Sequence, residues 1–165
     1  MSRGFVLVEV SITFVVLSLA LVALLPVFML AIRAAKGTEH IEVASHLAAE
    51  LMEEVRLRKW DSATPKPRRH VSKPGALGLE TGEVASDKRT FDDIDDFAGW
   101  VESRPLDPLM RPLAAFPAYS RGVTVRYVDA DLNPASGPTD YKQVTACAQA
   151  PKMKPLCLDT VLTNR

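Results

Sequence analysis

The sequence has few of the residues that most often form catalytic and metal sites. It contains three histidines and two cysteines in 165 residues. His40 and His46 are six residues apart, which does not place both on one helix face, and His70 lies among basic residues. No serine or cysteine has neighbours of the kind that activate a nucleophile. These shortages argue against an enzyme.

The sequence also has no net charge, with 20 basic and 20 acidic residues. A protein with nucleic acid or an anionic surface as its obligatory partner usually has a basic excess, so we expect neither partner to be obligatory. One short segment is basic through Lys66, Arg68, Arg69 and Lys73, but no aromatic residues interleave with it. We interpret it as a solvated loop or as a contact to an acidic neighbouring subunit.

Charge is nearly missing from a long N-terminal stretch, residues 5–32. Its polar side chains are Glu9, Ser11, Thr13 and Ser18. As a helix, this stretch of about 28 residues extends about 42 Å, more than the ~30 Å hydrocarbon core of a membrane. A signal peptide would have an apolar core of only about 7–15 residues followed by a cleavage site of small residues, which this sequence does not offer. The pattern predicts a retained transmembrane helix.

Helical periodicity continues beyond the apolar stretch. Between Ile41 and Val55 apolar residues recur at three-to-four-residue spacing, and helix-forming residues dominate. We therefore expect one long helix over residues 5–60, apolar all round at first and amphipathic over residues 33–60. Pro26 and Gly37 are the expected sites of a kink or local unwinding.

The remainder, residues 61–165, is expected to be a globular region. Residues 64–117 show no sustained periodicity and predict a long connecting region, packed on the helix by four apolar residues. These are Phe91, Ile94, Phe97 and Trp100. Alternation predicts strands over residues 123–128, 141–148 and 156–163, the last two as a hairpin. The expected fold class is α+β, with one long helix packed on a small C-terminal antiparallel sheet.

The two cysteines lie in the expected hairpin. Placing Cys147 opposite Cys157 also pairs Thr145 with Asp159 on the same face. The other face then carries mainly apolar side chains, those of Val144, Ala146, Leu158, Thr160 and Leu162. This register predicts a cross-strand disulfide in an oxidising compartment, worth about 2–3 kcal/mol. Two reduced thiols are the alternative.

The segment Gly4-Phe5-Val6-Leu7-Val8-Glu9 and the helix after it resemble the N-terminus of type IV prepilins and type II secretion pseudopilins. The resemblance implies that prepilin peptidase removes a leader, residues 1–4, by cutting after Gly4. It also implies methylation of the new N-terminal Phe5, a role for Glu9 as the helix carboxylate of the family, and a helix-bending role for Pro26. Residues 92–100 and 119–128 resemble minor pilins of the PilV kind.

The resemblance implies a pilin-like fold and a structural, non-enzymatic role. The expected protein is a minor subunit of a type IV pilus, anchored by a single pass in the bacterial inner membrane before assembly. Its N-terminus is then cytoplasmic and its C-terminal region periplasmic. The implied partners are prepilin peptidase, other pilin or pseudopilin subunits and inner-membrane platform proteins. The alternatives are a minor pseudopilin of type II secretion or competence, and a single-span membrane protein that never polymerises.

The chemistry of Glu9 supports a role in filament assembly independently of the family resemblance. Cleavage after Gly4 creates a cationic amine at Phe5, one helical turn from Glu9. An amine and a carboxylate in a membrane are both costly unless they pair. We hypothesise that Glu9 meets the amine of a neighbouring subunit and sets the register between stacked helices.

Two acidic segments are candidate calcium sites, although no cofactor is expected to be required. The first has the oxygen spacing of a calcium loop in Asp129, Asp131, Asn133 and Asp140, but Pro134 replaces the turn glycine. Some pseudopilins bind calcium in this region of the fold. The second comprises Asp92, Asp93, Asp95 and Asp96. For both, a solvated turn is the favoured interpretation.

Overall fold

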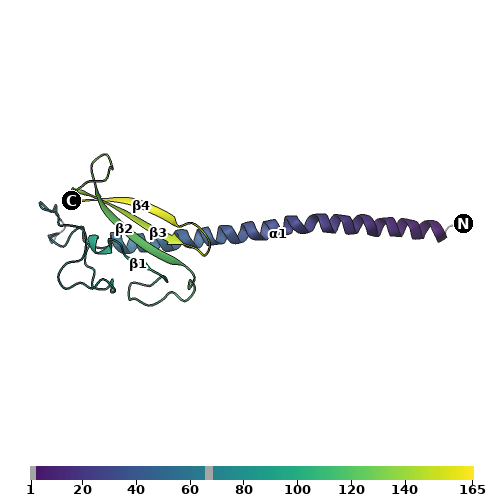
Figure 1. The fold of residues 1–165 in the computed structure, drawn as a ribbon, viewed down its shortest axis with the longest axis horizontal. Coiled ribbons are helices and arrows are strands. Elements are labelled where there is room, and N and C mark those ends of the chain that lie inside the picture. The colour runs from purple at the N-terminus through teal and green to yellow at the C-terminus, as the bar shows by residue number, and fades with distance from the viewer. Residues whose placement is uncertain (1–2, 66–68) are drawn as a thin grey trace. The chain divides into compact units, whose positions relative to one another are not determined.

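The computed structural model describes residues 3–65 and 69–165, with side chains from residue 7 onward. Its elements follow the chain as one long helix, a 3-10 turn and four strands (Figure 1). They are α1 (Arg3–Arg56), η1 (Asp95–Phe97), β1 (Val101–Glu102), β2 (Ser120–Val128), β3 (Tyr141–Gln149) and β4 (Leu156–Thr163). This is the α+β layout expected from the sequence.

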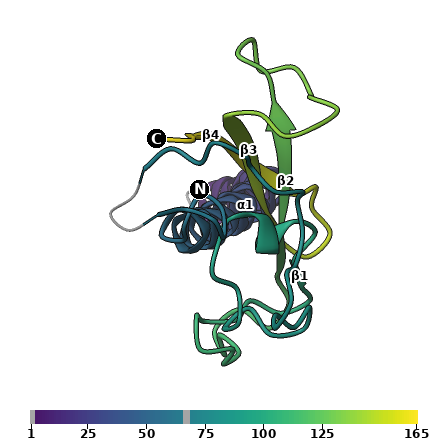
Figure 2. The same ribbon diagram turned by 90° about the vertical axis from the view of Figure 1, so that its left-hand side faces the viewer.

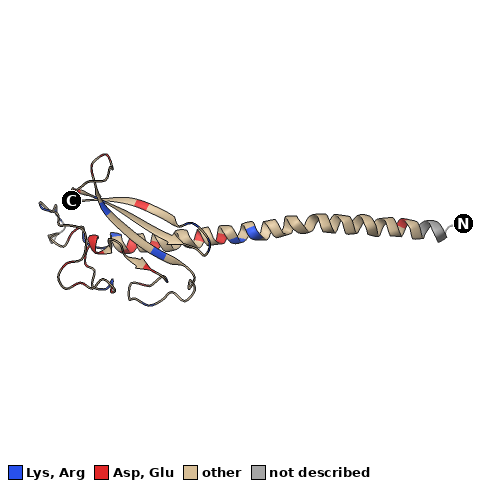
Figure 3. Cartoon of the chain, in the orientation of Figure 1, with Lys and Arg blue, Asp and Glu red and all other residues tan. Residues whose placement is uncertain are grey.

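The chain divides into two units by its internal contacts, residues 1–40 and residues 41–165. The first unit belongs almost entirely to α1. Its large apolar side chains are exposed on all faces, for example Leu7 at 71% and Leu30 at 69%. Figure 3 shows no acidic or basic residue along α1 between Glu9 and Arg33. The helix is continuous through Pro26 and Gly37, so the local unwinding expected there is absent.

In the second unit, the last turns of α1 form the hydrophobic core together with one face of the sheet (Figure 2). The helix contributes a stripe at the predicted spacing, comprising Ala44, Leu47, Ala48, Leu51, Met52 and Val55. The sheet contributes alternate residues of β2 and β3, and the connecting region adds Phe91, Ile94, Phe97 and Trp100 as predicted. Phe91 packs edge-to-face on both Phe97 and Trp100.

The sheet is an antiparallel meander in the order β1-β2-β3-β4. Its β3–β4 hairpin has the predicted register, with Cys147 opposite Cys157 and Thr145 opposite Asp159. The cysteines form a disulfide, as expected. At the other edge, β1 lies so close to β2 that a Cβ on Gly122 would approach the Trp100 carbonyl oxygen to 2.9 Å. Glycine is required there for close pairing of the strands.

The helix ends at Arg56, four residues before the end expected from the sequence. Lys59 instead forms a parallel bridge with Asp93. Its N–H donates to the Asp92 carbonyl, and its own carbonyl accepts from the Ile94 N–H. These hydrogen bonds replace the helical hydrogen bonds and bring the acidic segment, residues 92–96, against the end of α1.

Candidate functional site

The N-terminal apolar segment is the first candidate site. Gly4 and Phe5 lie in the first turn of α1, while Met1, Ser2 and the side chains of residues 3–6 lie outside the described atoms. Of the described helices, α1 alone is long and apolar enough to cross a membrane. This agrees with a single-pass membrane protein.

Glu9 differs from the other polar residues of this segment. The hydroxyls of Ser11, Thr13 and Ser18 each donate to the carbonyl four residues earlier, at 2.7–2.8 Å. They are therefore satisfied by their own helix, which makes them inexpensive in lipid. The exposed Glu9 carboxylate has no hydrogen bond or ion pair with the described residues.

A second candidate site gathers acidic side chains from two turns of the connecting region. The first turn is closed by the Glu83 N–H, which donates to the Glu80 carbonyl at 3.3 Å. The Glu80 N–H in turn donates to Glu83 Oε2 at 2.7 Å. Gly82 has φ of 106°, a left-handed conformation that glycine adopts without strain. This turn places the side chains of Glu80 and Glu83 together.

The second turn is built by the aspartates of residues 92–96. Asp96 Oδ2 accepts the backbone N–H groups of Asp92 and Asp93 at 2.8 and 3.0 Å. Asp93 Oδ1 accepts the Asp95 N–H at 2.9 Å. The other oxygens of these two buried carboxylates, Asp93 Oδ2 and Asp96 Oδ1, have no hydrogen-bond partner among the described residues. Buried oxygens of this kind are expensive to leave unpaired.

The two turns meet. One carboxylate oxygen each from Glu80, Asp93 and Asp96 lies within 4.8 Å of the others, and the same holds for Glu83, Asp92 and Asp96. We call these five residues the acidic cluster. Among the described residues, Lys59 pairs with this cluster, and its Nζ lies 2.5 Å from Asp92 Oδ2.

Two carboxyl groups of the cluster, those of Asp93 and Glu83, resist ionisation. Burial, a side-chain hydrogen bond with Asp95 and the charges of Asp95, Asp96 and Glu80 raise the pKa of Asp93 to about 9. Burial and the neighbouring Asp96 and Glu80 carboxyls raise the pKa of Glu83 to about 7. Both shifts are due first to burial, and the neighbouring carboxyl groups add to them.

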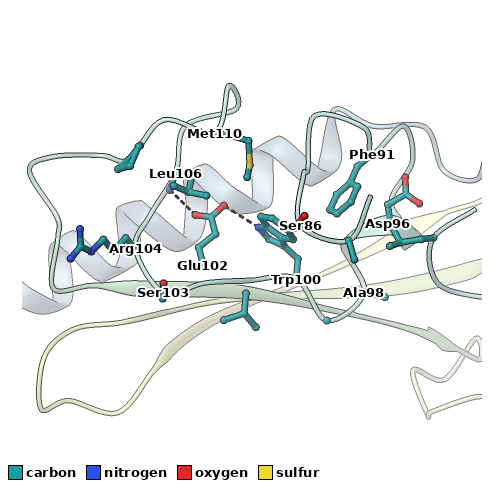
Figure 4. Close-up of a pocket in the computed structure, with 15 residues that line it drawn as sticks. Ser86, Phe91, Asp96, Ala98, Trp100, Glu102, Ser103, Arg104, Leu106 and Met110 are labelled. Atoms are coloured by element: carbon teal, nitrogen blue, oxygen red, sulfur yellow. Dashed lines mark hydrogen bonds between the residues drawn. The ribbon is translucent and has the colours of Figure 1, made fainter. Parts of the chain in front are cut away.

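An open groove of about 630 Å³ reaches the acidic cluster at Asp96. Figure 4 shows Asp96 at one end of it beside Phe91, with Trp100, Glu102 and Leu106 further along. The groove gives solvent and small ions access to Asp96.

A second buried acidic group lies at Glu102 on β1. Its carboxylate accepts from Lys88 Nζ at 2.9 Å, Arg121 Nε at 2.6 Å and the Trp100 indole at 3.0 Å. Although burial alone would raise the pKa of Glu102, the bonds from Arg121 and Trp100 hold it below its usual value. Lys88 also pairs with Glu54 at 2.8 Å, so this network joins α1 to the sheet.

A third buried charged residue, Lys142 on β3, lies against Asp95 of the acidic segment, residues 92–96. Its Nζ donates to Asp95 Oδ1 at 2.5 Å and to the Trp60 carbonyl at 2.6 Å. It also stands over the Trp60 ring, 4.2 Å from the centroid. Asp95 therefore has a cation of its own and is not part of the acidic cluster.

The calcium candidate of residues 129–140 is arranged differently. Asp129 Oδ1 accepts the N–H groups of Asp131 and Asn133 at 2.9 and 2.8 Å, and these bonds lower the pKa of Asp129. Asp140 Oδ1 contacts His70 Nε2 at 3.1 Å and accepts from the Asn164 amide at 2.8 Å. The Asp129 and Asp140 carboxylates are thus engaged by donors of the protein itself.

The other predicted residues are dispersed. Arg69, Lys73 and His46 are exposed, while Lys66 and Arg68 lie outside the described residues. Sequence reasoning missed Glu80 and Glu83, because only the fold brings their turn to the aspartates. It also missed the buried bases Lys142 and Arg121, although strand alternation puts both on the inner face with Val144 and Val123.

Comparison with protein-family models, with curated proteins and with solved structures gave no match.

Proposed function

We propose that this chain is a structural subunit, minor in amount, of a type IV pilus or a related filament of the type II secretion or competence kind. In this proposal it is inserted in the inner membrane through residues 5–32, cut after Gly4 by prepilin peptidase and methylated at Phe5. Its role is assembly and not catalysis, and its partners are like subunits and the membrane platform that assembles them.

The observation that carries the proposal is the contrast between Glu9 and the hydroxyls around it. Those hydroxyls bond to their own helix, whereas the described residues supply nothing for the carboxylate. A helix that only anchors a domain gains nothing from an acid in its apolar segment. A helix that stacks against copies of itself gains a fixed axial register when the acid meets a neighbour's N-terminal amine.

The exposure of the apolar segment supports the same proposal. Transferring about 28 apolar residues from lipid to water would be prohibitive at ~25 cal/mol per Å². A subunit can leave the membrane when its helix passes directly into a bundle of like helices. The apolar surface on all faces of α1 between Leu7 and Ile32 suits both lipid and such a bundle.

The processing step is tested by mass spectrometry of the protein isolated from its own cells. The proposal expects a mature N-terminus at Phe5 carrying one added methyl group. An intact Met1, or an uncut bond between Gly4 and Phe5, contradicts it.

The assembly step is tested by comparing Glu9→Ala with Thr13→Val in filaments sheared from cells. Glu9→Ala is expected to reduce the amount of this subunit in filaments by at least about tenfold, since ~1.4 kcal/mol of lost pairing gives that factor. Thr13→Val removes a hydroxyl that bonds only its own helix, so it is expected to assemble normally. Equal incorporation of both variants would remove the role assigned to Glu9.

A further inference from the structure

We propose that Glu80, Asp93 and Asp96 bind a divalent metal cation, with calcium as the preferred ion. The inference concerns the domain of residues 41–165 and does not depend on the filament proposal. Neither a failure to polymerise nor an uncut N-terminus would affect it.

Ligand atoms from the three residues converge on one point. Three carboxylate oxygens, one from each residue, lie within 4.8 Å of one another. Oxygens that bind one Ca²⁺ at 2.3–2.6 Å are separated by no more than about 5 Å, so a single ion can reach all three. They come from two separate turns that the fold brings together.

Two buried carboxylate oxygens of these residues have no partner among the described residues. Asp93 is fully buried and Asp96 is 3% exposed, yet Asp93 Oδ2 and Asp96 Oδ1 have no hydrogen-bond donor among the described residues. Backbone N–H groups occupy the opposite oxygen of each carboxylate and fix its orientation. A cation is the partner that would satisfy both free oxygens at once.

The charges of the acidic cluster also favour a bound cation. The acidic cluster has five carboxyl groups, and Lys59 pairs with the one at its exposed side, Asp92. A divalent cation lowers this repulsion, whereas a nearby lysine or arginine already does so for Asp95 and Glu102.

The choice of calcium follows from the ligands. All three are hard carboxylate oxygens, without the histidine or cysteine that favours zinc or copper. Glu80 is exposed and the groove opens on Asp96, so water can complete a coordination shell of six to eight oxygens. Of the two groups of ligands, the one with Asp93 is favoured because it holds two buried carboxylates that each keep an unbonded oxygen, whereas the group with Glu83 and Asp92 holds only one.

The test is thermal unfolding of the full chain in detergent, first in EDTA and then with calcium chloride at about 10 mM. With a Kd of about 10⁻⁴–10⁻³ M, as in extracellular calcium modules, the melting temperature should rise by about 5–10 °C. Calorimetric titration should give about one ion per chain. Magnesium at the same concentration should give a smaller rise, because it requires stricter octahedral geometry.

Three variants locate the ion. Asp93→Asn keeps an oxygen for the Asp95 N–H but removes the charge, and it should abolish most of the calcium-dependent rise. Glu80→Gln is exposed and cannot disrupt the core, and it should weaken binding at least about tenfold. Asp129→Asn, in the other acidic turn, should respond to calcium as the unmodified protein does.

The inference is overturned if calcium leaves the melting temperature of the unmodified protein unchanged, or if Asp93→Asn and Glu80→Gln both keep the full rise. Loss of the rise in Asp129→Asn alone would also overturn it and would move the ion to the turn at residues 129–133.

Discussion

Two buried acidic groups in the same domain have opposite electrostatic surroundings. Glu102 is enclosed by Lys88, Arg121 and the Trp100 indole, and its pKa is lowered. Asp93 lies among other carboxyl groups, and its pKa is raised to about 9. The backbone provides each with N–H donors, so the difference comes from the side chains alone.

The contrast separates a structural role from a binding role. A carboxylate whose buried cations are already in place contributes to the fold and has no capacity left for a ligand. A carboxylate buried without a cation costs stability until something positive binds. Substitutions that remove each charge should therefore change stability in opposite directions.

The largest effect is expected for Glu102→Gln. It leaves Lys88 and Arg121 buried without their shared carboxylate, which should lower the free energy of unfolding by about 3–5 kcal/mol. Thermal unfolding followed by tryptophan fluorescence measures this. Glu53→Gln breaks the exposed pair with Arg56 and serves as the control, with little change expected. A small effect of Glu102→Gln would show that the network is not structural.

Low pH should reduce the difference in melting temperature between Glu102→Gln and the unmodified protein. Because the folded-state pKa of Glu102 lies below the unfolded value of about 4.3, its stabilisation is complete above that pH. It is lost as the pH falls through the folded-state pKa. The gap in melting temperature should therefore be constant from about pH 5 to 7 and narrow below about pH 4. A gap that widens in acid would contradict the assigned ion pairs.

The opposite sign is expected for Asp93→Asn in EDTA at neutral pH. It removes an uncompensated buried acid, and its amide can donate to the neighbouring carboxylates, so stability should rise by about 1–3 kcal/mol. The measurement is the melting temperature without divalent ions. A fall of similar size would mean that the Asp93 charge is balanced within the chain, and the comparison with Glu102 would fail.

The smallest effect is expected for Asp129→Asn. The asparagine oxygen can still accept the N–H groups of Asp131 and Asn133, and the turn is exposed. Its melting temperature in EDTA should stay within about 2 °C of the unmodified protein. A larger change would show that the Asp129 charge, and not only the turn, matters there.

Much of the fold could be predicted from local patterns. Three-to-four-residue spacing located the buried stripe of α1, and alternation around Cys147 and Cys157 gave the hairpin register and the disulfide. The end of α1 was placed four residues late, because Lys59 leaves the helix to pair with Asp93, a contact between distant residues. Patterns within one segment of the sequence do not reveal a contact between residues that are distant along the chain.

Only part of the acidic cluster could be predicted from the sequence. The aspartates of residues 92–96 were recognised as an oxygen-rich run, but the group at residues 129–140 has the oxygen spacing of a calcium loop and was the preferred calcium candidate. The structure separates them, because Asp129 is saturated by its own turn whereas Asp93 and Asp96 retain free buried oxygens. Orientation and burial of single oxygens depend on three-dimensional packing.

The sequence by itself determined the apolar helix with its single acid, the amphipathic half after it and the disulfide hairpin, because each depends on spacing along one or two neighbouring segments. Only the tertiary structure decided which buried charges find a counterion. Lys88, Glu102 and Arg121 meet from three separate segments, and Glu80 joins Asp93 and Asp96 across a loop. Electrostatic energy depends on distance in space and on exclusion of water, and neither can be read from order along the chain.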